Sequence, residues 1–177
     1  MTTLLYIIGT LLLIIIVLIM ISPSGYHVHR SIEVNKPLGE VFNYVKYLKN
    51  QDKWSPWKKK DPQMKQEMKG EDGSVGVIAS WDGNKQVGSG EQEIVKIVEN
   101  EMIESKLRFF KPWKSESDAY LKVEETSEGK TKVIWGFSGK NEFPSRIFMT
   151  FFNMDKTVGK DFEEGLNDLK EQLEQTK

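Results

Sequence analysis

Metal chemistry is limited by the ligands that the chain supplies, which are two histidines and no cysteine in 177 residues. His27 and His29 are two apart, so on a strand their side chains share one face, as two ligands of a metal would. A zinc site takes three or four ligands, and no cysteine or third histidine completes this pair. We therefore predict a solvated histidine pair near the surface, and no metal site.

Serine-hydrolase and nucleotide-binding motifs are also missing. A Ser–His–Asp system would need His27 or His29 as its base, and neither lies near a Gly-x-Ser-x-Gly elbow. The sequence GSG at 88–90 lacks the Gly-x-Gly-x-x-Gly spacing, and the EQEIV that follows it continues a strand pattern. This GSG indicates a bulge or bend in a sheet. We expect no cofactor.

Two carboxylates, Glu91 and Glu93, are the remaining candidates for acid–base chemistry, because on a strand they share one face. If that face pointed inward, burial would raise a pKa into the range of a general acid or base. The apolar residues around them fall on both parities, so a bulge after Gly90 is compatible with the pattern. A solvated face is favoured, since surface charges usually stay exposed. We assign no catalytic residue; Glu91 and Glu93 are the first to test.

The N-terminal segment is the clearest element. Residues 4–21 read LLYIIGTLLLIIIVLIMI, close to the roughly 17–25 apolar residues that cross a bilayer. A cleaved signal peptide would need a positive start and a small-residue cleavage site, which MTT and ISPSG do not provide. We predict a transmembrane anchor and linker at 1–24. Arg30 and Lys36 follow it, and the positive-inside rule then places the rest of the chain in the cytoplasm.

Residues 25–177 are predicted to form one domain. Alternation over 26–34 predicts a half-buried strand, and Pro37 begins a helical pattern. Turn signals then separate six strand patterns, at 63–69, 75–81, 86–98, 102–110, 113–125 and 130–143, which should pair antiparallel. Asp155 begins a long helix with one apolar stripe. This order predicts an α+β protein with one sheet and one long helix in two layers.

The stretch KWSPWKKKD at 53–61 places two tryptophans beside three lysines. Such a cluster could contact nucleic acid, a membrane surface or the mouth of a pocket. The chain has 25 basic and 26 acidic residues, and this balance argues against nucleic-acid binding.

Four segments resemble the SRPBCC superfamily, which includes START-like lipid-binding domains. They read YHVHRSIEVNKPLGEVFNYV, WSPW followed by KKKDP, SWDGNKQVGSGEQEI and TVGKDFEEGLNDLK, and the resemblance covers residues 26–173. The likeness is greatest to the bacterial polyketide cyclase/dehydrase-like branch, whose members often carry an N-terminal membrane segment. It implies a helix-grip fold, in which a curved antiparallel sheet of about seven strands surrounds the C-terminal helix.

The same resemblance implies a cavity between sheet and helix, and hence a binding protein for a hydrophobic small molecule, lipid- or isoprenoid-like. The candidate ligand-binding residues are Trp54, Trp57, Trp81, Leu107, Phe109, Trp135, Phe137, Phe148, Phe152 and Phe162. Each alone could simply fill a core. Tyr120 or Arg108 could orient a polar end of the ligand. Trp54 and Trp57 would pack at the cavity rim, and Lys58–Lys60 would face solvent or anionic headgroups.

Two other functions remain open at this stage. One is an enzyme of the polyketide cyclase/dehydratase kind, which needs a polar group with a shifted pKa facing the cavity. The other is a ligand-free interaction module, which predicts a filled interior.

Overall fold

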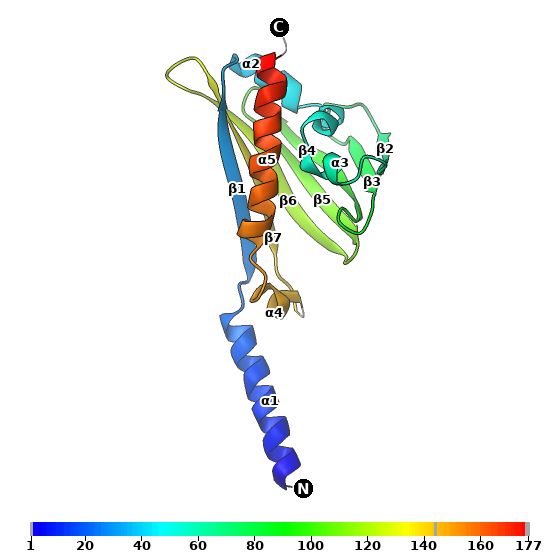
Figure 1. Cartoon of the computed structure of the whole chain (residues 1–177), viewed down its shortest axis with the longest axis vertical. Helices are drawn as coiled ribbons and strands as arrows, with labels where there is room; N and C mark the ends of the chain where they lie inside the picture. Colours follow the sequence, from blue (N-terminus) through cyan, green and yellow to red (C-terminus); the bar gives the residue numbers. More distant parts are fainter. Residues whose placement is uncertain (1, 144, 176–177) are drawn as a thin grey trace.

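The computed structural model describes residues 2–143 and 145–175, and an extended helix and a two-layer domain make up this part of the chain (Figure 1). Helix α1 (Thr2–Ile21) projects from one end of the domain, and none of its residues is buried. By length and composition it is able to cross a membrane, and no other described helix is. The predicted anchor segment is therefore a continuous, exposed apolar helix.

Seven antiparallel strands form a single sheet in the order β1-β7-β6-β5-β4-β3-β2. The strands are β1 (Gly25–Val34), β2 (Lys65–Lys69), β3 (Ile78–Asp82), β4 (Ser89–Val98), β5 (Met102–Lys111), β6 (Ser115–Glu125) and β7 (Thr131–Lys140). Strands β2 to β7 pair with their chain neighbours, as the turn signals predicted. Strand β1 pairs with β7, so that Val28 lies opposite Phe137. This long-range pairing places the start of the domain beside its last strand.

The strand beginnings differ from the prediction where the backbone leaves the extended region. Strand β4 begins at Ser89 and not at residue 86, because Gly88 has a φ of 71°, which a side chain would strain. Within β4 the register shifts between Ser89 and Gly90 and again between Ile94 and Lys96. The first shift confirms the irregularity predicted at GSG. The second leaves Val95 unpaired and puts Ile94 and Ile97 on the same face.

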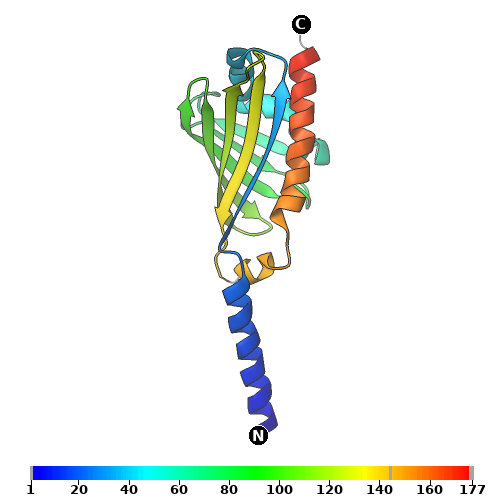
Figure 2. The ribbon, with the colours of Figure 1, turned by 90° about the vertical axis from the view of Figure 1, so that its left-hand side faces the viewer.

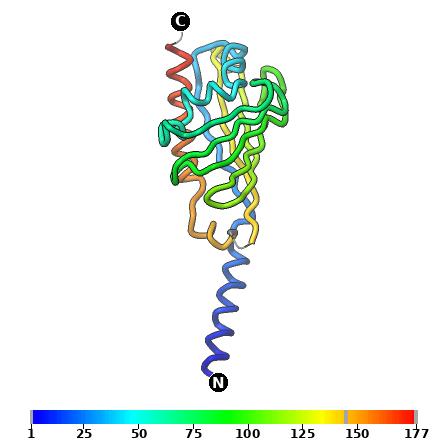
Figure 3. Tube along the Cα trace, turned by 90° about the vertical axis from the view of Figure 1, so that its right-hand side faces the viewer, coloured from blue at the N-terminus to red at the C-terminus, as the bar shows by residue number. Residues whose placement is uncertain are grey.

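Five helical segments accompany the sheet: α2 (Leu38–Val45), the 3-10 helix η1 (Leu48–Lys53), α3 (Pro56–Lys60), α4 (Ser145–Met149) and α5 (Met154–Gln175). Helix α5 lies along the sheet beside β1 and runs nearly its full length (Figure 2). It buries the apolar stripe that its spacing predicted: Phe162, Leu166, Leu169 and Leu173. Segments η1 and α3 contact α5 on the same side of the sheet, and the chain then enters the edge of the sheet as β2 and β3 (Figure 3).

The core lies between α5 and the sheet face that carries Val133, Trp135 and Phe137. The ring of Trp135 stacks on that of Phe162, with centroids 4.1 Å apart and planes 9° apart. This contact shows which face of the sheet α5 covers. We call that face the inner face. The architecture is the predicted α+β helix-grip fold, with seven antiparallel strands around a long C-terminal helix.

Candidate functional site

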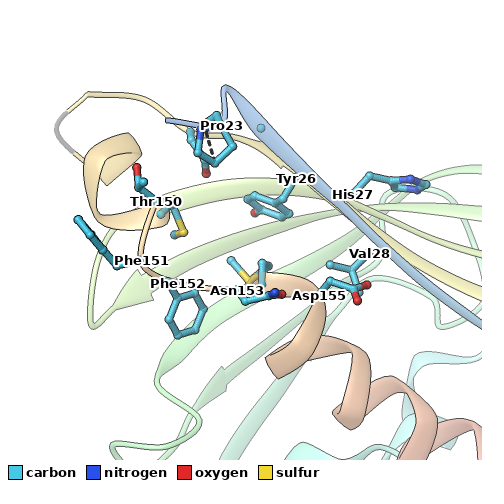
Figure 4. Close-up of a pocket in the computed structure, with 13 residues that line it drawn as sticks. Pro23, Tyr26, His27, Val28, Thr150, Phe151, Phe152, Asn153 and Asp155 are labelled. Carbon is cyan, nitrogen blue, oxygen red and sulfur yellow. Dashed lines mark hydrogen bonds between the residues drawn. The ribbon is translucent and has the colours of Figure 1, made fainter. Parts of the chain in front are cut away.

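A pocket of about 400 Å³ lies at the end of the domain next to α1 (Figure 4). The start of β1, residues 25–28, forms one wall, and the connection from α4 to α5, residues 149–155, forms another. Pro23 and Asn141 complete the lining. The two walls are more than 120 residues apart in the chain, and only the pairing of β1 with β7 and the packing of α5 on β1 bring them together.

Apolar and polar groups both line this pocket, and several of the polar groups already have protein partners. Met149, Phe152 and Met154 contribute apolar surface. The Asn141 side-chain amide donates to the Pro23 carbonyl at 3.1 Å, and the Asn153 side-chain oxygen accepts from the Lys156 N–H at 2.8 Å. These amides therefore shape the pocket through backbone contacts.

Tyr26 forms the inner wall, with its ring pointing from β1 toward the α4–α5 connection, while His27 points away (Figure 4). Its hydroxyl lies 2.8 Å from Ser117 Oγ. Burial raises the pKa of Tyr26, the nearby charge of Asp118 raises it further, and the Ser117 hydrogen bond acts in the opposite direction. At neutral pH this hydroxyl is a neutral donor or acceptor at the end of the pocket.

A row of aromatic rings continues from Tyr26 across the inner face. Tyr26 and Phe137 have ring centroids 5.1 Å apart, Phe137 and Phe109 6.4 Å, and Phe109 and Trp81 5.8 Å. Trp81, Leu107 and Phe109 remain partly exposed. These contacts connect three of the predicted ligand-binding residues, Trp81, Phe109 and Phe137, to Tyr26 of the pocket's inner wall.

A second group of predicted ligand-binding residues fills the space between α5 and the sheet. Trp54 is fully buried, and its ring packs edge-on against that of Trp135, with centroids 5.0 Å apart. The partly buried Trp57 also packs edge-on against Trp135, with ring centroids 5.5 Å apart. Phe162 stacks on the other side. The tryptophans therefore lie in the core, and none of these four residues lines the pocket. Side chains occupy the space that the resemblance had suggested as a cavity.

The last two predicted residues lie near α4. Phe152 lines the pocket, and Phe148 has its ring 6.0 Å from that of Phe152. Most of the actual lining was not predicted from the sequence, notably Tyr26, Val28, Met149 and Phe151. The available signal was the run RIFMTFFNM at 146–154, whose apolar residues fit no single helical stripe. Such a run without one buried face is typical of a segment that packs irregularly.

A charged group, the Asp155 carboxylate, lies at the edge of the pocket and pairs with Arg30. Arg30 lies on the inner face and forms ion pairs with Asp155 at 2.9 Å and Glu163 at 2.6 Å. The hydrogen bond from Arg30 holds the pKa of the Asp155 carboxyl below its usual value. The carboxylate is thus committed to attaching the first turns of α5 to β1.

Glu91 and Glu93 lie on the opposite face of the sheet, which we call the outer face. Arg108 donates to Glu91 at 2.9 Å and to Glu93 at 2.7 Å. Tyr120 is on the same face, where its hydroxyl lies 3.2 Å from His27 Nε2. Neither the two carboxylates nor Arg108 lines the pocket. Among residues 2–143 and 145–175, no group of three or more histidine and acidic side chains is arranged to hold a metal ion.

Two lysines of the 53–61 stretch, Lys59 and Lys60, pair with α5. Lys60 Nζ lies 2.6 Å from Asp161, and Lys59 pairs with Asp168 and, at 3.4 Å, with Glu164. The three carboxylates recur every three to four residues, so they share one side of α5. Lys59 and Lys60 therefore join α3 to α5, whereas Lys58 donates to the Gln66 side chain at 2.8 Å, so the three lysines are not oriented solely toward solvent or headgroups.

Comparison with known proteins identifies the family. The family model described as polyketide cyclase / dehydrase and lipid transport matches residues 26–174. Curated proteins give no match to the sequence.

Solved structures share the fold at low identity. A protein from Mesorhizobium loti is 14% identical, with a TM-score of 0.62, and the match covers 86% of this chain and 99% of that one. The major latex-like protein 151 of Panax ginseng is 14% identical, with a TM-score of 0.58 over 85% and 98% of the two chains. A protein from Nitrosospira multiformis is 19% identical, with a TM-score of 0.57 over 84% and 96%. The chain belongs to the polyketide cyclase / dehydrase and lipid transport family.

Proposed function

We propose that this protein is a membrane-anchored binding protein for a hydrophobic small molecule, lipid- or isoprenoid-like. The observation that carries the proposal is the pocket of about 400 Å³ beside the apolar helix α1. Its volume falls within the roughly 300–1,000 Å³ of small-molecule sites, which are mostly apolar with a few polar groups. Lipid transport in the family's description supports this class of ligand.

The proposed ligand enters between β1 and the α4–α5 connection and extends along the aromatic row of the inner face. Phe152 and Tyr26 contact its outer part, and Trp81, Leu107, Phe109 and Phe137 its inner part. The Tyr26 hydroxyl is the polar group that a ligand's alcohol or carbonyl oxygen would meet. Trp54, Trp57, Trp135 and Phe162 support this surface from behind, and Phe148 supports Phe152.

Helix α1 is proposed to be an uncleaved anchor with the domain on its cytoplasmic side. Its 20 residues rise about 30 Å as a helix, which matches the hydrocarbon core of a bilayer. Arg30 and Lys36 are the first cations that follow it in the chain, as the positive-inside rule requires of a cytoplasmic flank.

The two rival functions make different demands on the site. An acid–base enzyme built on Glu91 or Glu93 would need these carboxylates to reach the ligand, whereas they pair with Arg108 on the outer face. A ligand-free module fits the filled region between α5 and the sheet, but it leaves the pocket at the α1 end without a role.

Extraction of the purified domain tests the proposal. Residues 25–177 contain the whole buried core, since α1 contributes no buried residue, so this fragment is suited to the experiment. Organic extraction followed by mass spectrometry should release one recurring class of apolar compound. A protein that is consistently empty, and that does not bind a fluorescent fatty acid, would contradict the proposal.

A matched pair of variants then locates the site. Phe152→Ala should weaken binding of the fluorescent fatty acid several-fold, because Phe152 lines the pocket. Met68→Ala removes a similarly exposed apolar side chain from β2, far from the pocket, and should leave affinity unchanged. Equal losses in the two variants would mean that the probe binds elsewhere.

A further inference from the structure

Four exposed aromatic side chains gather around the pocket at the α1 end: Trp113, Phe148, Phe151 and Phe152, which we call the aromatic rim. Trp113 is 74% exposed and Phe151 77%. The ring of Trp113, on the turn between β5 and β6, lies 6.3 Å from that of Phe148 on α4. Phe148 in turn lies 6.0 Å from Phe152. Two segments far apart in sequence thus present one exposed apolar surface.

Exposed aromatic residues are confined to one part of this domain. All the phenylalanines and tryptophans classed as exposed among residues 2–143 and 145–175 lie between Phe110 and Phe152. The other exposed large apolar side chains outside α1 are Met68, Val75 and Val95, and they are scattered. Single exposed apolar residues need no explanation, but a contiguous aromatic surface indicates a binding partner.

The rim is fixed to the end of α1. Arg146 of α4 donates from Nε and Nη2 to the Ser22 carbonyl, at 3.0 and 2.8 Å. Ser22 Oγ also lies 2.6 Å from Thr150 Oγ1. Figures 1 and 2 show α4 directly beside the last turn of α1. The rim therefore lies at the depth at which α1 ends.

That depth identifies the partner. A helix of 20 residues spans about 30 Å, so if α1 crosses the hydrocarbon core, Ser22 lies at its boundary with the headgroups. Tryptophan is enriched at this boundary, where a ring can be partly in lipid and partly hydrated. Lys111 and Lys114 flank Trp113, and Arg146 belongs to α4, so cations lie beside the rings where anionic headgroups would be.

We propose that the aromatic rim inserts into the headgroup–acyl boundary of the bilayer that α1 crosses, so that the pocket opens directly into the lipid leaflet. This inference rests on the anchor in the proposed function. It gives α4 and the β5–β6 turn a role in addition to the anchor: they hold the domain against the membrane with the space between β1 and the α4–α5 connection facing lipid. A ligand then passes between leaflet and pocket without crossing water.

Spin labelling of the full chain in liposomes tests the inference. The chain has no cysteine, so each introduced cysteine gives one labelled site. Trp113→Cys and Phe151→Cys report on the rim. Val75→Cys, 59% exposed on the β2–β3 connection, is the matched control, and Leu12→Cys reports on the middle of α1. All four side chains are exposed, and circular dichroism checks that each variant is folded.

The readout is collision of the label with oxygen, which concentrates in lipid, relative to a water-soluble nickel chelate. We expect the oxygen-to-nickel ratio at 113 and 151 to exceed that at 75 several-fold and to approach that at 12. Ratios at 113 and 151 equal to that at 75, with 12 still in lipid, would overturn this inference and leave the anchor intact. An aqueous ratio at 12 would overturn the anchor and the inference together.

A second copy of the chain is the other occupant to exclude. Spin–spin broadening between labels at 151 that disappears on dilution with unlabelled protein would show that the rim is covered by another copy, and would overturn the inference. Unbroadened spectra with lipid-like ratios support it. Fatty-acid binding by residues 25–177 is measured without a membrane, so the ligand proposal stands or fails separately.

Discussion

Tyr26 is the residue at which the pocket and the core meet, because its ring packs on Phe137 and its hydroxyl on Ser117. Its burial disfavours the charged phenolate, so the pKa in the folded protein lies above the ordinary value of 10.0. We expect the difference between the ultraviolet titrations of the wild type and Tyr26→Phe to show one tyrosine that ionises above pH 10. A difference signal with a midpoint at or below 10 would contradict this environment.

The same shift has a defined effect on stability. Because the folded pKa is raised, the stabilisation associated with a neutral Tyr26 is fully present below the unfolded pKa and is lost as the pH rises through the folded pKa. As the pH rises above 10, the free energy of unfolding should therefore fall more steeply in the wild type than in Tyr26→Phe. Urea unfolding at a series of pH values measures this difference. Tyr44, whose pKa burial also raises, contributes equally to both proteins and cancels in the comparison.

Glu91 and Glu93 illustrate how a face assignment decides a role. Both bind Arg108 on the outer face, so we expect Glu91→Gln to leave fatty-acid affinity unchanged. The cost in unfolding free energy should be about 1 kcal/mol or less, as for other partly exposed ion pairs. Loss of turnover of a bound compound in Glu91→Gln would instead establish the acid–base enzyme, and parallel binding and turnover assays of the wild type and Glu91→Gln decide between these outcomes.

At the scale of elements, the close approach of α5 to the sheet depends on a small residue. A side-chain carbon added at Gly165 would lie 2.8 Å from the Trp135 ring and 3.0 Å from Pro56, both rigid neighbours. We expect Gly165→Ala to destabilise the domain by about 1–3 kcal/mol through overpacking. The higher helix propensity of alanine offsets up to about 1 kcal/mol of this loss. Urea unfolding measures the net effect.

Gly39 provides the matched control for that substitution. It lies in helix α2, and a carbon added there has no neighbour closer than 3.8 Å. Gly39→Ala should therefore be neutral or stabilise by up to about 1 kcal/mol, because alanine favours a helix. Equal destabilisation by the two substitutions would show that packing against Trp135 is not what requires glycine at 165.

The attachment of α5 to β1 should depend on pH through Asp155. Its folded pKa is lowered by the hydrogen bond from Arg30, so the associated stability is present above the unfolded value near 3.8 and is lost as the pH falls through the folded pKa. Asp155→Asn should therefore be less stable than the wild type at pH 7, with the difference shrinking toward pH 3. A difference that does not change with pH would mean that the ion pair is not its source.

At the scale of the whole molecule, α1 does not contribute to the core of the domain, but hydrogen bonds at its C-terminal end hold it next to the domain. No α1 residue is buried, and the contacts between them are those of Ser22, Pro23 and α4. We expect residues 25–177 to unfold in urea at nearly the same midpoint as the full chain in liposomes, followed by far-UV circular dichroism. A large decrease in the midpoint of the fragment would show that α1 stabilises the fold directly.

The sequence by itself determined the elements: the apolar run of α1, the meander of β2 to β7, the stripe of α5 and the family resemblance. These are local patterns, or patterns repeated along a strand or helix, and each appears within a window of contiguous residues. The same patterns could not assign Glu91 and Glu93 to a face, because the bulge at Val95 exchanges the two faces within β4. They also could not show that Lys59 and Lys60 meet the carboxylates of α5, about a hundred residues away.

Only the tertiary structure decided where the pocket lies. The residues predicted to bind a ligand were chosen as large and apolar, which describes core and pocket residues equally; Trp54, Trp57, Trp135 and Phe162 proved to pack against one another in the core. The pocket instead forms where residues 25–28 meet residues 149–155. That meeting depends on the pairing of β1 with β7 and on the path of α4 around the end of α1. Contacts between such distant segments are a property of the folded chain, and no local pattern encodes them.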